Sequence, residues 1–580
     1  MGRGAHAAFG VVQAAPKERV LIRVLGSTLL GLYMHSRFFR WFSERSYQLV
    51  AQNRSLASSV TLSLFGDEFA RPSYAFAKGL WVRWLGVVYL IAFASFTHQI
   101  PGLVGDEGIL PASVFFEHWA QELPKLSDRI LIFPTLAWFF QSTVALQVMG
   151  WLGAVAGVFL IWNRTRGLSL LAAVVAFFSY LSLQHAGQIF LQYQWDSLLL
   201  ECGFFTVLLL AAPKPRVFCV GRCAPYESGW ESRMRWVFLA IFAKLLFLSG
   251  WVKLASGDPS WRDGTALLVH FETQPLPSLL SSPLTQALRG LASLGAVGRM
   301  CVQSLTYTVI GIELLAPIFI FGPRRIRWLG IWILSSLQVA ILLTGHYGFF
   351  NLLTLGLGFW LLDDRAWRGL WKASWQPVWI RRLMLGSVFR KPRVLSLLDS
   401  LRRKRAAFWI GLLSLVVVLL PAFHSERLAR VNFLLAQWGI SHPYGLFAVM
   451  TTERRELVFE VSSDGQKWRE LLFSDKPVAL NQGAPLRLAH LPRLDWQMWF
   501  AAMGSVDESP WVLEFAERIL HGDAQVLALL GEGEAASQAE QDPRYIRGHL
   551  YRYRFSRDQT WERELLMPLW LPPRELPRVR

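Results

Sequence analysis

Three long stretches of this chain contain no aspartate, glutamate, lysine or arginine, and they limit what it can fold into more than any other feature. They cover residues 130–163, 167–195 and 328–362. A helix that crosses the hydrocarbon core of a bilayer needs roughly 20 apolar residues, so each stretch is long enough to cross. Charged residues make up only 17% of the chain, whereas a soluble domain has roughly 25%. The sequence therefore predicts a polytopic α-helical membrane protein.

About nine membrane spans are expected, and the charges of the loops orient them. The loop 363–406 carries twelve Lys and Arg against three Asp, and the other basic loops fall on the same side as the N-terminus. Because short basic loops stay in the cytoplasm, this pattern places the N-terminus inside and the C-terminal region outside. Segment 130–140 is expected to be a re-entrant or interfacial helix broken at Pro134. The expected spans are 83–99, 141–162, 167–184, 196–212, 234–255, 304–322, 326–345, 347–362 and 407–421.

The sequence from about residue 424 is typical of a soluble domain. Apolar and polar residues alternate in 456–461 and again in 467–473, and an Asp-Gly turn separates the two runs, which predicts a β-hairpin. Residues 510–521 have one apolar face and predict a helix, while 545–555 predict another strand. We expect a β-rich, sandwich-like α+β domain.

The expected organisation has three parts. Residues 1–80 form a basic N-terminal extension with an interfacial helix, 81–423 form the multi-span helical membrane domain, and 424–580 form an extracytoplasmic β-rich domain. The formal net charge of +18 does not indicate nucleic-acid binding, because the basic residues cluster in loops between apolar segments.

Cysteines and short motifs give little support to an enzyme of a standard class. The chain has four cysteines, too few for a disulfide scaffold. Cys219 and Cys223 share a basic loop that we place in the cytoplasm, and we interpret them as unrelated thiols in preference to a redox pair or half of a metal site. No Ser-x-x-Lys, Gly-x-Ser-x-Gly, Walker-type, His-Glu-x-x-His or Cys-x-x-Cys motif occurs. No cofactor and no metal are expected.

The segment Gln194-Trp-Asp-Ser-Leu-Leu-Leu-Glu201 puts two acids at the start of an apolar segment. Asp196 and Glu201 are five residues apart, which separates them by about 140° on a helix, so they do not form a catalytic pair. Asp196 is close enough to the span entrance to be hydrated at the interface. Glu201 lies a turn deeper, where an acid is functional or internally paired. We favour a structural pairing for Glu201.

A second polar cluster follows the apolar segment that ends at Lys253. It is either a snorkelling lysine followed by a capped turn at Gly257 and Asp258, or a polar site at the outer surface that grips a peptide or polarises a substrate. Lys244 lies nine residues before Lys253, about 180° around a helix, so the two cannot face one cavity and one of them should snorkel. The members of this cluster are Lys253, Asp258, Trp261, Arg262, Asp263, His270 and Glu272.

The longest uncharged run is interrupted by Gly345-His-Tyr-Gly-Phe-Phe-Asn351. Gly345 and Gly348 permit a tight turn between two antiparallel spans. His346 and Asn351 need hydrogen-bond partners in such a place.

Together these segments resemble the lipase maturation factor family. The residues 194–201 are similar to the family signature Q-W-D-x-L-L-L-E, and further similar segments follow in the family's order between about 83 and 566. They are Gly108-Ile-Leu-Pro-Ala, Lys253 to Pro277, His346–Asn351, Pro443-Tyr-Gly-Leu-Phe and Leu494-Asp-Trp-Gln-Met-Trp499. The resemblance implies a membrane-resident folding or assembly factor that acts on secreted lipases from the non-cytoplasmic side. It supplies no catalytic residues.

The resemblance also implies the location and the partners. Animal members reside in the endoplasmic reticulum membrane, whereas the compact chain and its divergent basic N-terminus are similar to bacterial members, for which the site is the inner membrane. The implied partners are secreted lipase clients and the lipid bilayer. Candidate functional residues come from the segments described above: Trp195, Asp196, Glu201, Lys253, Asp258, Trp261, Arg262, Asp263, His270, Glu272, His346, Asn351, Asp495 and Trp496.

A shorter similarity suggests a different class of protein. Ser-Gly-x-x-Lys-Leu at the end of a span, followed by Asp and Trp, is similar to the segment that bears the essential lysine of vitamin K-dependent carboxylases. The alternative hypothesis is therefore a membrane-embedded carboxylase-like or group-transfer enzyme with Lys253 as its base. A base needs a lowered pKa, and the nearby Asp258 and Asp263 would favour the charged lysine instead.

Overall fold

The computed structural model describes residues 33–65, 72–211, 229–372, 426–480, 490–531, 543–556 and 560–575. Helices α2 (Arg37–Gln52) and α3 (Arg54–Phe65) belong to one unit, made of residues 1–70 with Pro323–Arg325, and the rest of the chain forms a second unit. The features that follow belong to the second unit.

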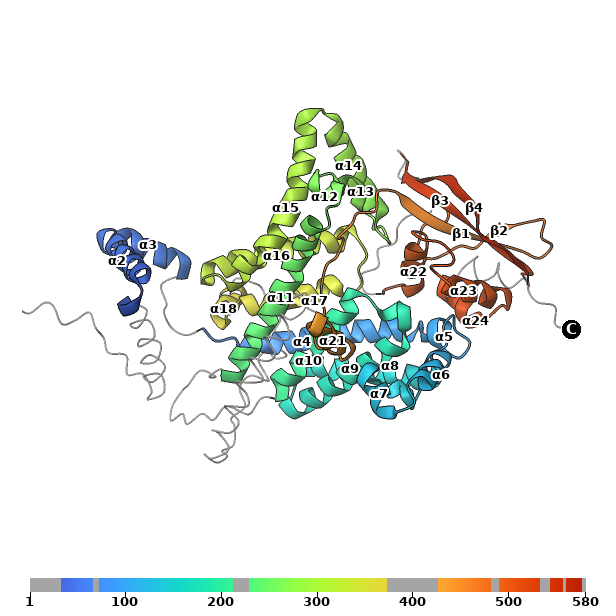
Figure 1. Cartoon of the computed structure of the whole chain (residues 1–580), viewed down its shortest axis with the longest axis horizontal. Coiled ribbons are helices and arrows are strands. Elements are labelled where there is room, and N and C mark those ends of the chain that lie inside the picture. Colours follow the sequence, from blue (N-terminus) through green and yellow to red (C-terminus); the bar gives the residue numbers. More distant parts are fainter. Residues whose placement is uncertain are drawn as a thin grey trace, which may run out of the picture. The chain divides into compact units, whose positions relative to one another are not determined.

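Among the described residues, seven helices are long and apolar enough to cross a membrane, and they coincide with the first seven expected spans (Figure 1). The eighth expected span, 347–362, is a shorter pair of helices, α17 (Phe350–Gly358) and η3 (Phe359–Leu361). The ninth, 407–421, lies outside the described residues, as do Cys219 and Cys223. The seven helices are α4 (Ala75–Thr97), α8 (Thr143–Trp162), α9 (Arg166–Ala186), α10 (Gln194–Ala211), α11 (Gly229–Ala255), α15 (Ala296–Phe321) and α16 (Arg324–Thr344).

Helix α4 begins earlier than the expected span 83–99 because its basic residues are satisfied within the protein. Lys78 forms an ion pair with Glu231 at 2.5 Å. The buried Arg83 donates from Nη1 to the carbonyl oxygen of Gly79 at 3.0 Å. Lys78 and Arg83, which mark the edge of the expected span in the sequence, therefore lie inside helix α4.

Glycines allow α4 and α8 to approach each other closely. A Cβ atom added at Gly86 would lie 2.7 Å from the carbonyl oxygen of Gly157, and one added at Gly153 would lie 2.2 Å from the ring of Phe93. Small residues at such a contact are typical of helices that pack in a membrane, where van der Waals contact drives association.

The segment 345–364 runs antiparallel to α4 along its length. At one end the Asp364 carboxylate accepts hydrogen bonds from the first backbone N–H groups of α4. At the other end His346 Nε2 lies 2.6 Å from the carbonyl oxygen of His490, whose ring nitrogen is 3.2 Å from Ser95 Oγ near the end of α4. Although its helices are short, this segment connects the two ends of the helical domain.

Shorter helices fill the loops between the long ones. In the segment 130–140, α7 ends at Ile132 and a single 3₁₀ turn, η1, follows Pro134, which agrees with the expected helix broken at this proline. The short elements are α5 (Ile100–Val104), α6 (Ala112–Glu122), α7 (Leu126–Ile132), η1 (Leu136–Trp138), η2 (Gln188–Leu191), α12 (Pro259–Arg262), α13 (Ala266–Thr273), α14 (Ser281–Ser293), α18 (Asp364–Lys372) and α21 (Glu426–Gln437).

Within the described residues, the C-terminal region forms one antiparallel sheet of four strands in the order β2-β1-β3-β4. The strands are β1 (Arg454–Ser462), β2 (Arg469–Glu470), β3 (Tyr545–Phe555) and β4 (Trp561–Glu575). The expected hairpin is confirmed by the pairing of Glu460 with Glu470, and β2 is shorter than expected. The expected strand 545–555 is β3, while β4 was not expected from the sequence.

Helices cover the sheet where a second sheet would lie in a sandwich (Figure 1). They are α22 (Arg493–Ala501), α23 (Trp511–Leu520), α24 (Ala524–Leu527) and the 3₁₀ turn η5 (Ala528–Leu530). The expected helix 510–521 is α23, and its Phe515 packs edge-on against Phe459 of β1, with ring centroids 5.4 Å apart. The β-rich α+β character is thus confirmed. The sheet differs from a sandwich because the apolar face of α23 provides its cover.

Candidate functional site

The predicted motif residues meet where the C-terminal domain joins the helical domain. Between α21 and β1 the chain passes along residues 437–450, called the connecting segment below. Its Gln437 carbonyl oxygen lies 3.0 Å from His185 Nε2 of α9, and its Gly445 N–H donates to Gln194 Oε1 at 3.1 Å. The connecting segment therefore lies directly against the Gln194–Glu201 motif.

Asp196 is bound by an arginine of the C-terminal domain. Arg493 Nη1 and Nη2 donate to the two carboxylate oxygens of Asp196 at 2.6 and 2.8 Å, and the Tyr180 hydroxyl donates to the same carboxylate at 2.6 Å. All three side chains are buried. Asp196 was expected to be hydrated at the interface, and this was wrong because Arg493 of α22 replaces the water. A bidentate pair of this kind fixes both distance and orientation.

Glu201 has the structural partner that we expected for it. Lys244 Nζ of α11 lies 2.7 Å from Glu201 Oε1, and the Tyr444 hydroxyl of the connecting segment donates to Glu201 Oε2. Burial raises the pKa of Tyr444, so the phenol keeps the proton that it donates. The two acids of the motif thus bind different parts of the C-terminal region: Asp196 binds α22 and Glu201 binds the connecting segment.

Lys253 is also paired inside the protein. Its Nζ lies 2.8 and 3.0 Å from the two carboxylate oxygens of Glu313 of α15 and 3.1 Å from the carbonyl oxygen of Ser249. Lys244 and Lys253 face different neighbours, as their spacing predicts. The expectation that one of them snorkels was wrong, because each lysine has a buried acid within reach.

The loop after Lys253 contains both buried and exposed members of the predicted cluster. Asp258 caps α12 through Oδ1 and accepts the Met450 N–H on Oδ2 at 2.9 Å. Trp261 Nε1 donates to the carbonyl oxygen of Phe447 at 2.8 Å. Arg262 and Asp263 point to solvent, with 73% and 56% of their side chains exposed. Asp258 and Trp261 therefore bind the connecting segment, and Arg262 and Asp263 lie apart from it.

Glu272 links α13 to the sheet and to α14. Its carboxylate accepts from Arg289 at 2.9 Å and from the Phe555 N–H of β3 at 2.9 Å. Nearby, the fully buried Arg454 of β1 donates to the carbonyl oxygens of Glu272 and Gln274 and to the Glu456 carboxylate. The sheet is thus bound to the α13–α14 loop by charge-assisted hydrogen bonds.

Aromatic side chains from five motif segments form one continuous row. The distances between ring centroids are 4.8 Å from Trp195 to Trp496, 5.9 Å from Trp496 to Tyr347 and 5.8 Å from Tyr347 to Phe447. Phe447 is 5.1 Å from His270, where burial lowers the pKa to about 4 and keeps the imidazole neutral. Three of these contacts are edge-to-face and the Trp496–Tyr347 contact is tilted, and aromatic pairs at these distances add to the packing energy.

His346, Asn351 and Asp495 each have at least one hydrogen-bond partner, although Asn351 Oδ1 has none. His346 contacts the His490 carbonyl as described, and Asn351 Nδ2 donates to Gln338 Oε1 of α16 at 3.1 Å. Asp495 accepts the Lys476 N–H at 2.9 Å, and burial raises the pKa of Asp495 to about 7, with the neighbouring Asp475 acting in the same direction.

Sequence reasoning missed the partners of these residues. Two of these partners could have been found from the sequence. Glu313 is a lone acid inside an apolar segment, and Arg493 is an arginine directly before a motif. Arg454 and Lys476 lie in ordinary strand and loop sequence and have no such signal. Tyr444 lies inside a motif, but nothing in the sequence connects it to Glu201.

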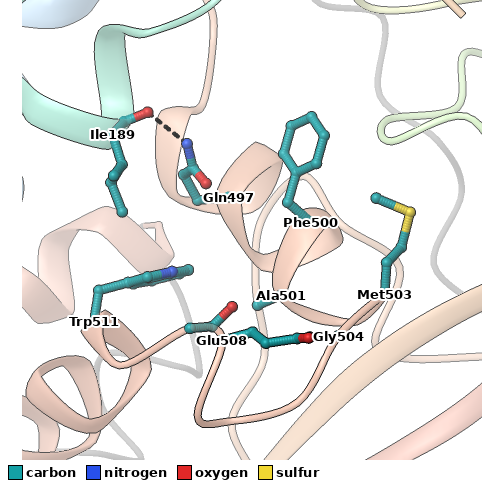
Figure 2. Close-up of a pocket in the computed structure, with 9 residues that line it drawn as sticks. Ile189, Gln497, Phe500, Ala501, Met503, Gly504, Glu508 and Trp511 are labelled. Carbon is teal, nitrogen blue, oxygen red and sulfur yellow. Dashed lines mark hydrogen bonds between the residues drawn. The ribbon is translucent and has the colours of Figure 1, made fainter. Parts of the chain in front are cut away.

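A pocket of about 420 Å³ lies beside this junction, between η2 of the helical domain and the α22–α23 region (Figure 2). Gln497 Nε2 donates to the carbonyl oxygen of Ile189 at 2.5 Å across its wall. Among the described residues, no cluster of three or more His, Cys, Asp or Glu side chains could hold a metal ion. The residues that line the pocket are Ile189, Gln497, Phe500, Ala501, Met503, Gly504, Glu508, Ser509 and Trp511.

The fold and the junction define a multi-pass membrane protein whose C-terminal α+β domain is bound to one end of its helical domain by buried charges. The family model of the lipase maturation factor transmembrane domain matches residues 76–369, and that of the lipase maturation factor C-terminal domain matches 440–570. The chain belongs to the lipase maturation factor family.

Individual relatives match most of the chain. Lipase maturation factor 2 of Gallus gallus is 31% identical, with 86% of this chain and 81% of the relative covered. Lipase maturation factor 2 of Homo sapiens is 31% identical, with 84% and 81% covered, and lipase maturation factor 1 of Homo sapiens is 26% identical, with 86% and 87% covered. No solved structure matches significantly.

Proposed function

We propose that this protein is a membrane-resident maturation factor for secreted lipases, without a catalytic site of its own, and that it acts from the non-cytoplasmic side. The observation that carries the proposal is the match of both family domains, in order, over most of the chain. The relatives are named for lipase maturation, and their similarity covers the helical and the C-terminal regions alike. The proposed clients are secreted lipases.

The arrangement of the described helices supports the proposed side of action. Asp364 caps the start of α4, so α18 begins at the same end of the helical domain as α4. The contact of Gln437 with His185 puts α21 at the opposite end, where Asp196 binds Arg493. The described residues on the two sides of 373–425 therefore lie at opposite ends of the helical domain, which is consistent with the expected span 407–421.

Loop charge assigns the two ends to the two sides of the membrane. Arg164 and Arg166 lie at the end where α4 begins, whereas Asp106 and Glu107 follow its other end. By the positive-inside rule the first end is cytoplasmic. The C-terminal domain would then face the periplasm in a bacterial inner membrane, which is the proposed location, or the lumen in an endoplasmic reticulum membrane.

The geometry of Lys253 counts against the alternative of a carboxylase-like enzyme. An ammonium group has three N–H donors, and the contacts with Glu313 and Ser249 occupy all of them. A general base needs an unprotonated nitrogen within reach of its substrate. The nitrogen of Lys253 instead faces Glu313 and Ser249 of the protein itself.

The proposed function is tested by deleting the gene and measuring secreted lipase activity together with lipase antigen. We expect the activity per unit of antigen to fall, while a secreted phosphatase from the same cells, as the control, keeps its specific activity. Unchanged specific activity of every secreted lipase would overturn the proposal.

The orientation is tested separately by fusing alkaline phosphatase or green fluorescent protein after Pro572. The proposal predicts phosphatase activity without fluorescence, because the phosphatase becomes active only outside the cytoplasm and the fluorescent protein only inside it. Bright cytoplasmic fluorescence would place the C-terminal domain inside and exclude contact with a secreted client.

A further inference from the structure

The pocket beside the junction has the lining of a binding site for polypeptide. Phe500 and Met503 contribute apolar side chains that are 42% and 39% exposed, and the indole of Trp511 forms one wall (Figure 2). Aromatic residues dominate the binding energy of protein interfaces, and the flexible thioether of methionine adapts to different partners. A volume of about 420 Å³ can hold one large side chain with part of its backbone.

Hydrogen bonds within the folded chain fix the walls of the pocket before any ligand binds. Gln497 is bound to Ile189 across the domain junction, and Arg493, one turn earlier on α22, is bound to Asp196. Trp570 Nε1 of β4 donates to the carbonyl oxygen of Gly504 at 3.0 Å. The pocket is therefore preformed and continuous with the junction, so that little ordering energy is spent when a ligand enters.

Among the nine residues that line the pocket, the one charged residue is acidic, although the chain as a whole is basic. The net charge is +18, yet the sequence between Arg493 and Arg518 contains no lysine or arginine. Glu508 lines the pocket, and both Glu508 and its neighbour Asp507 are exposed. Carboxylates at the rim attract lysine and arginine and repel carboxylates and phosphates, which disfavours a fatty acid or an anionic lipid headgroup as the natural occupant.

We propose that this pocket binds an apolar, preferably aromatic, side chain flanked by basic residues in an extended, incompletely folded polypeptide. Under the proposed function this polypeptide is the lipase client, and only the identity of the client rests on that function. The apolar lining supplies affinity, and the acidic rim selects segments of opposite charge.

The test measures binding of labelled peptides to the purified full-length protein in detergent by fluorescence anisotropy. The probe is a short Gly/Ser peptide with a central Lys-Trp-Lys, and the comparison peptides carry Glu-Trp-Glu or Lys-Ala-Lys at that place. We expect the first peptide to bind and both others to bind about tenfold more weakly.

Matched variants connect the binding to the pocket. Phe500→Ala combined with Met503→Ala should weaken binding of the Lys-Trp-Lys peptide about tenfold. Glu508→Gln, which keeps an acceptor for the Ser505 N–H, should weaken it a few-fold and reduce its salt dependence. The control is Met567→Ala, a methionine on β4 that is 50% exposed and does not line the pocket; it should bind like the wild type.

The outcomes separate this proposal from the proposed function. The pocket proposal would be overturned if the Glu-Trp-Glu peptide bound as tightly as the Lys-Trp-Lys peptide, or if Met567→Ala weakened binding as much as the Phe500→Ala and Met503→Ala double variant does. Displacement of the peptide by decanoate would also overturn it, in favour of a lipid ligand. Thermal unfolding of each variant identifies any that have lost their fold, and the salt dependence of Glu508→Gln then still tests the rim. If gene deletion leaves lipase specific activity unchanged while peptide binding persists, the proposed function fails and the pocket remains.

Discussion

Helix α22 contributes to two regions that differ in almost every physical respect. Towards the helical domain it presents Arg493 and Trp496, which are buried and paired with Asp196 and Trp195. Towards the pocket it presents Phe500, which is 42% exposed and shares the pocket lining with Glu508. Most of the motif residues that first attract attention in the sequence contact one another, whereas Arg262 and Asp263 are exposed. The pocket is lined mainly by residues outside these motifs, with Gln497 as the exception.

From this difference we infer that the contacts of the junction stabilise the fold, whereas the residues of the pocket bind a partner. Removing one member of a buried ion pair leaves an uncompensated charge and is costly, whereas changing an exposed side chain usually costs little. Variants of the junction should therefore lose structure before they lose any specific contact. Variants of the pocket should lose a contact while the fold remains.

The largest loss of stability is expected for Arg454→Met. The change leaves the Glu272 and Gln274 carbonyls without this buried donor and leaves the Glu456 carboxylate with Lys476 alone, at a cost of about 3–5 kcal/mol. Thermal unfolding of the purified protein in detergent measures it. Arg262→Met is the control, since that side chain is mostly exposed and should leave the melting temperature unchanged. Equal melting temperatures of the two variants would contradict the inference that the buried contacts of the junction stabilise the fold.

A smaller loss of stability is expected at Lys253, where the substitution also tests the hypothesis that this lysine acts as a base. Lys253→Met should destabilise the helical domain by up to about 3 kcal/mol, because Glu313 remains buried and must take up a proton. The double variant Lys253→Met with Glu313→Gln should recover most of the stability and should support lipase maturation in the deletion strain. A stable double variant that fails to complement would revive the role of Lys253 as a base.

Tyr444→Phe removes a single hydrogen bond between the connecting segment and the helical domain. Since the Glu201 carboxylate keeps Lys244, we expect a loss of about 1–3 kcal/mol, typical of a hydrogen bond to a charged group. Protease cleavage within 437–450 should become faster in this variant. An unchanged cleavage rate would show that the connecting segment is held without the Glu201 contact.

The last effect is a dependence of stability on pH. Burial raises the pKa of Asp495 to about 7, with Asp475 raising it further and Lys476 opposing. The folded state therefore binds the proton more tightly than the unfolded state, and this contribution is lost as the pH rises from about 4 to about 7, by roughly 1.4 kcal/mol per pH unit at most. Asp495→Asn should flatten the decline in melting temperature over this range. The same slope in wild type and variant would assign the dependence to another group.

The sequence predicted the elements of this fold better than their contacts. Uninterrupted apolar stretches identified α8 and α9 almost to the residue, because hydropathy and helix length are local properties. The start of α4 was misplaced because Lys78 is neutralised by Glu231, 153 residues away along the chain. Period-2 alternation located β1 and β3 but not β4, where three prolines interrupt the pattern.

The candidate site shows the same limit. Lone acids in apolar segments predicted that Glu201 needs a partner, and the need was real. The identity of that partner is a property of the fold, since Lys244 and Tyr444 reach Glu201 from segments 43 and 243 residues away. The pocket was not predicted at all, because Phe500, Met503 and Trp511 have no pattern that distinguishes a lining residue from a core residue.

The central claim is that Asp196 and Arg493 hold the two domains together as one interacting pair. A double-mutant cycle tests it directly, with unfolding measured in detergent for wild type, Asp196→Asn, Arg493→Gln and the double variant. The account predicts that each single change is strongly destabilising and that the double variant costs less than their sum, with a coupling of about 1–3 kcal/mol. Strictly additive losses would show that the two side chains act independently and would contradict the account.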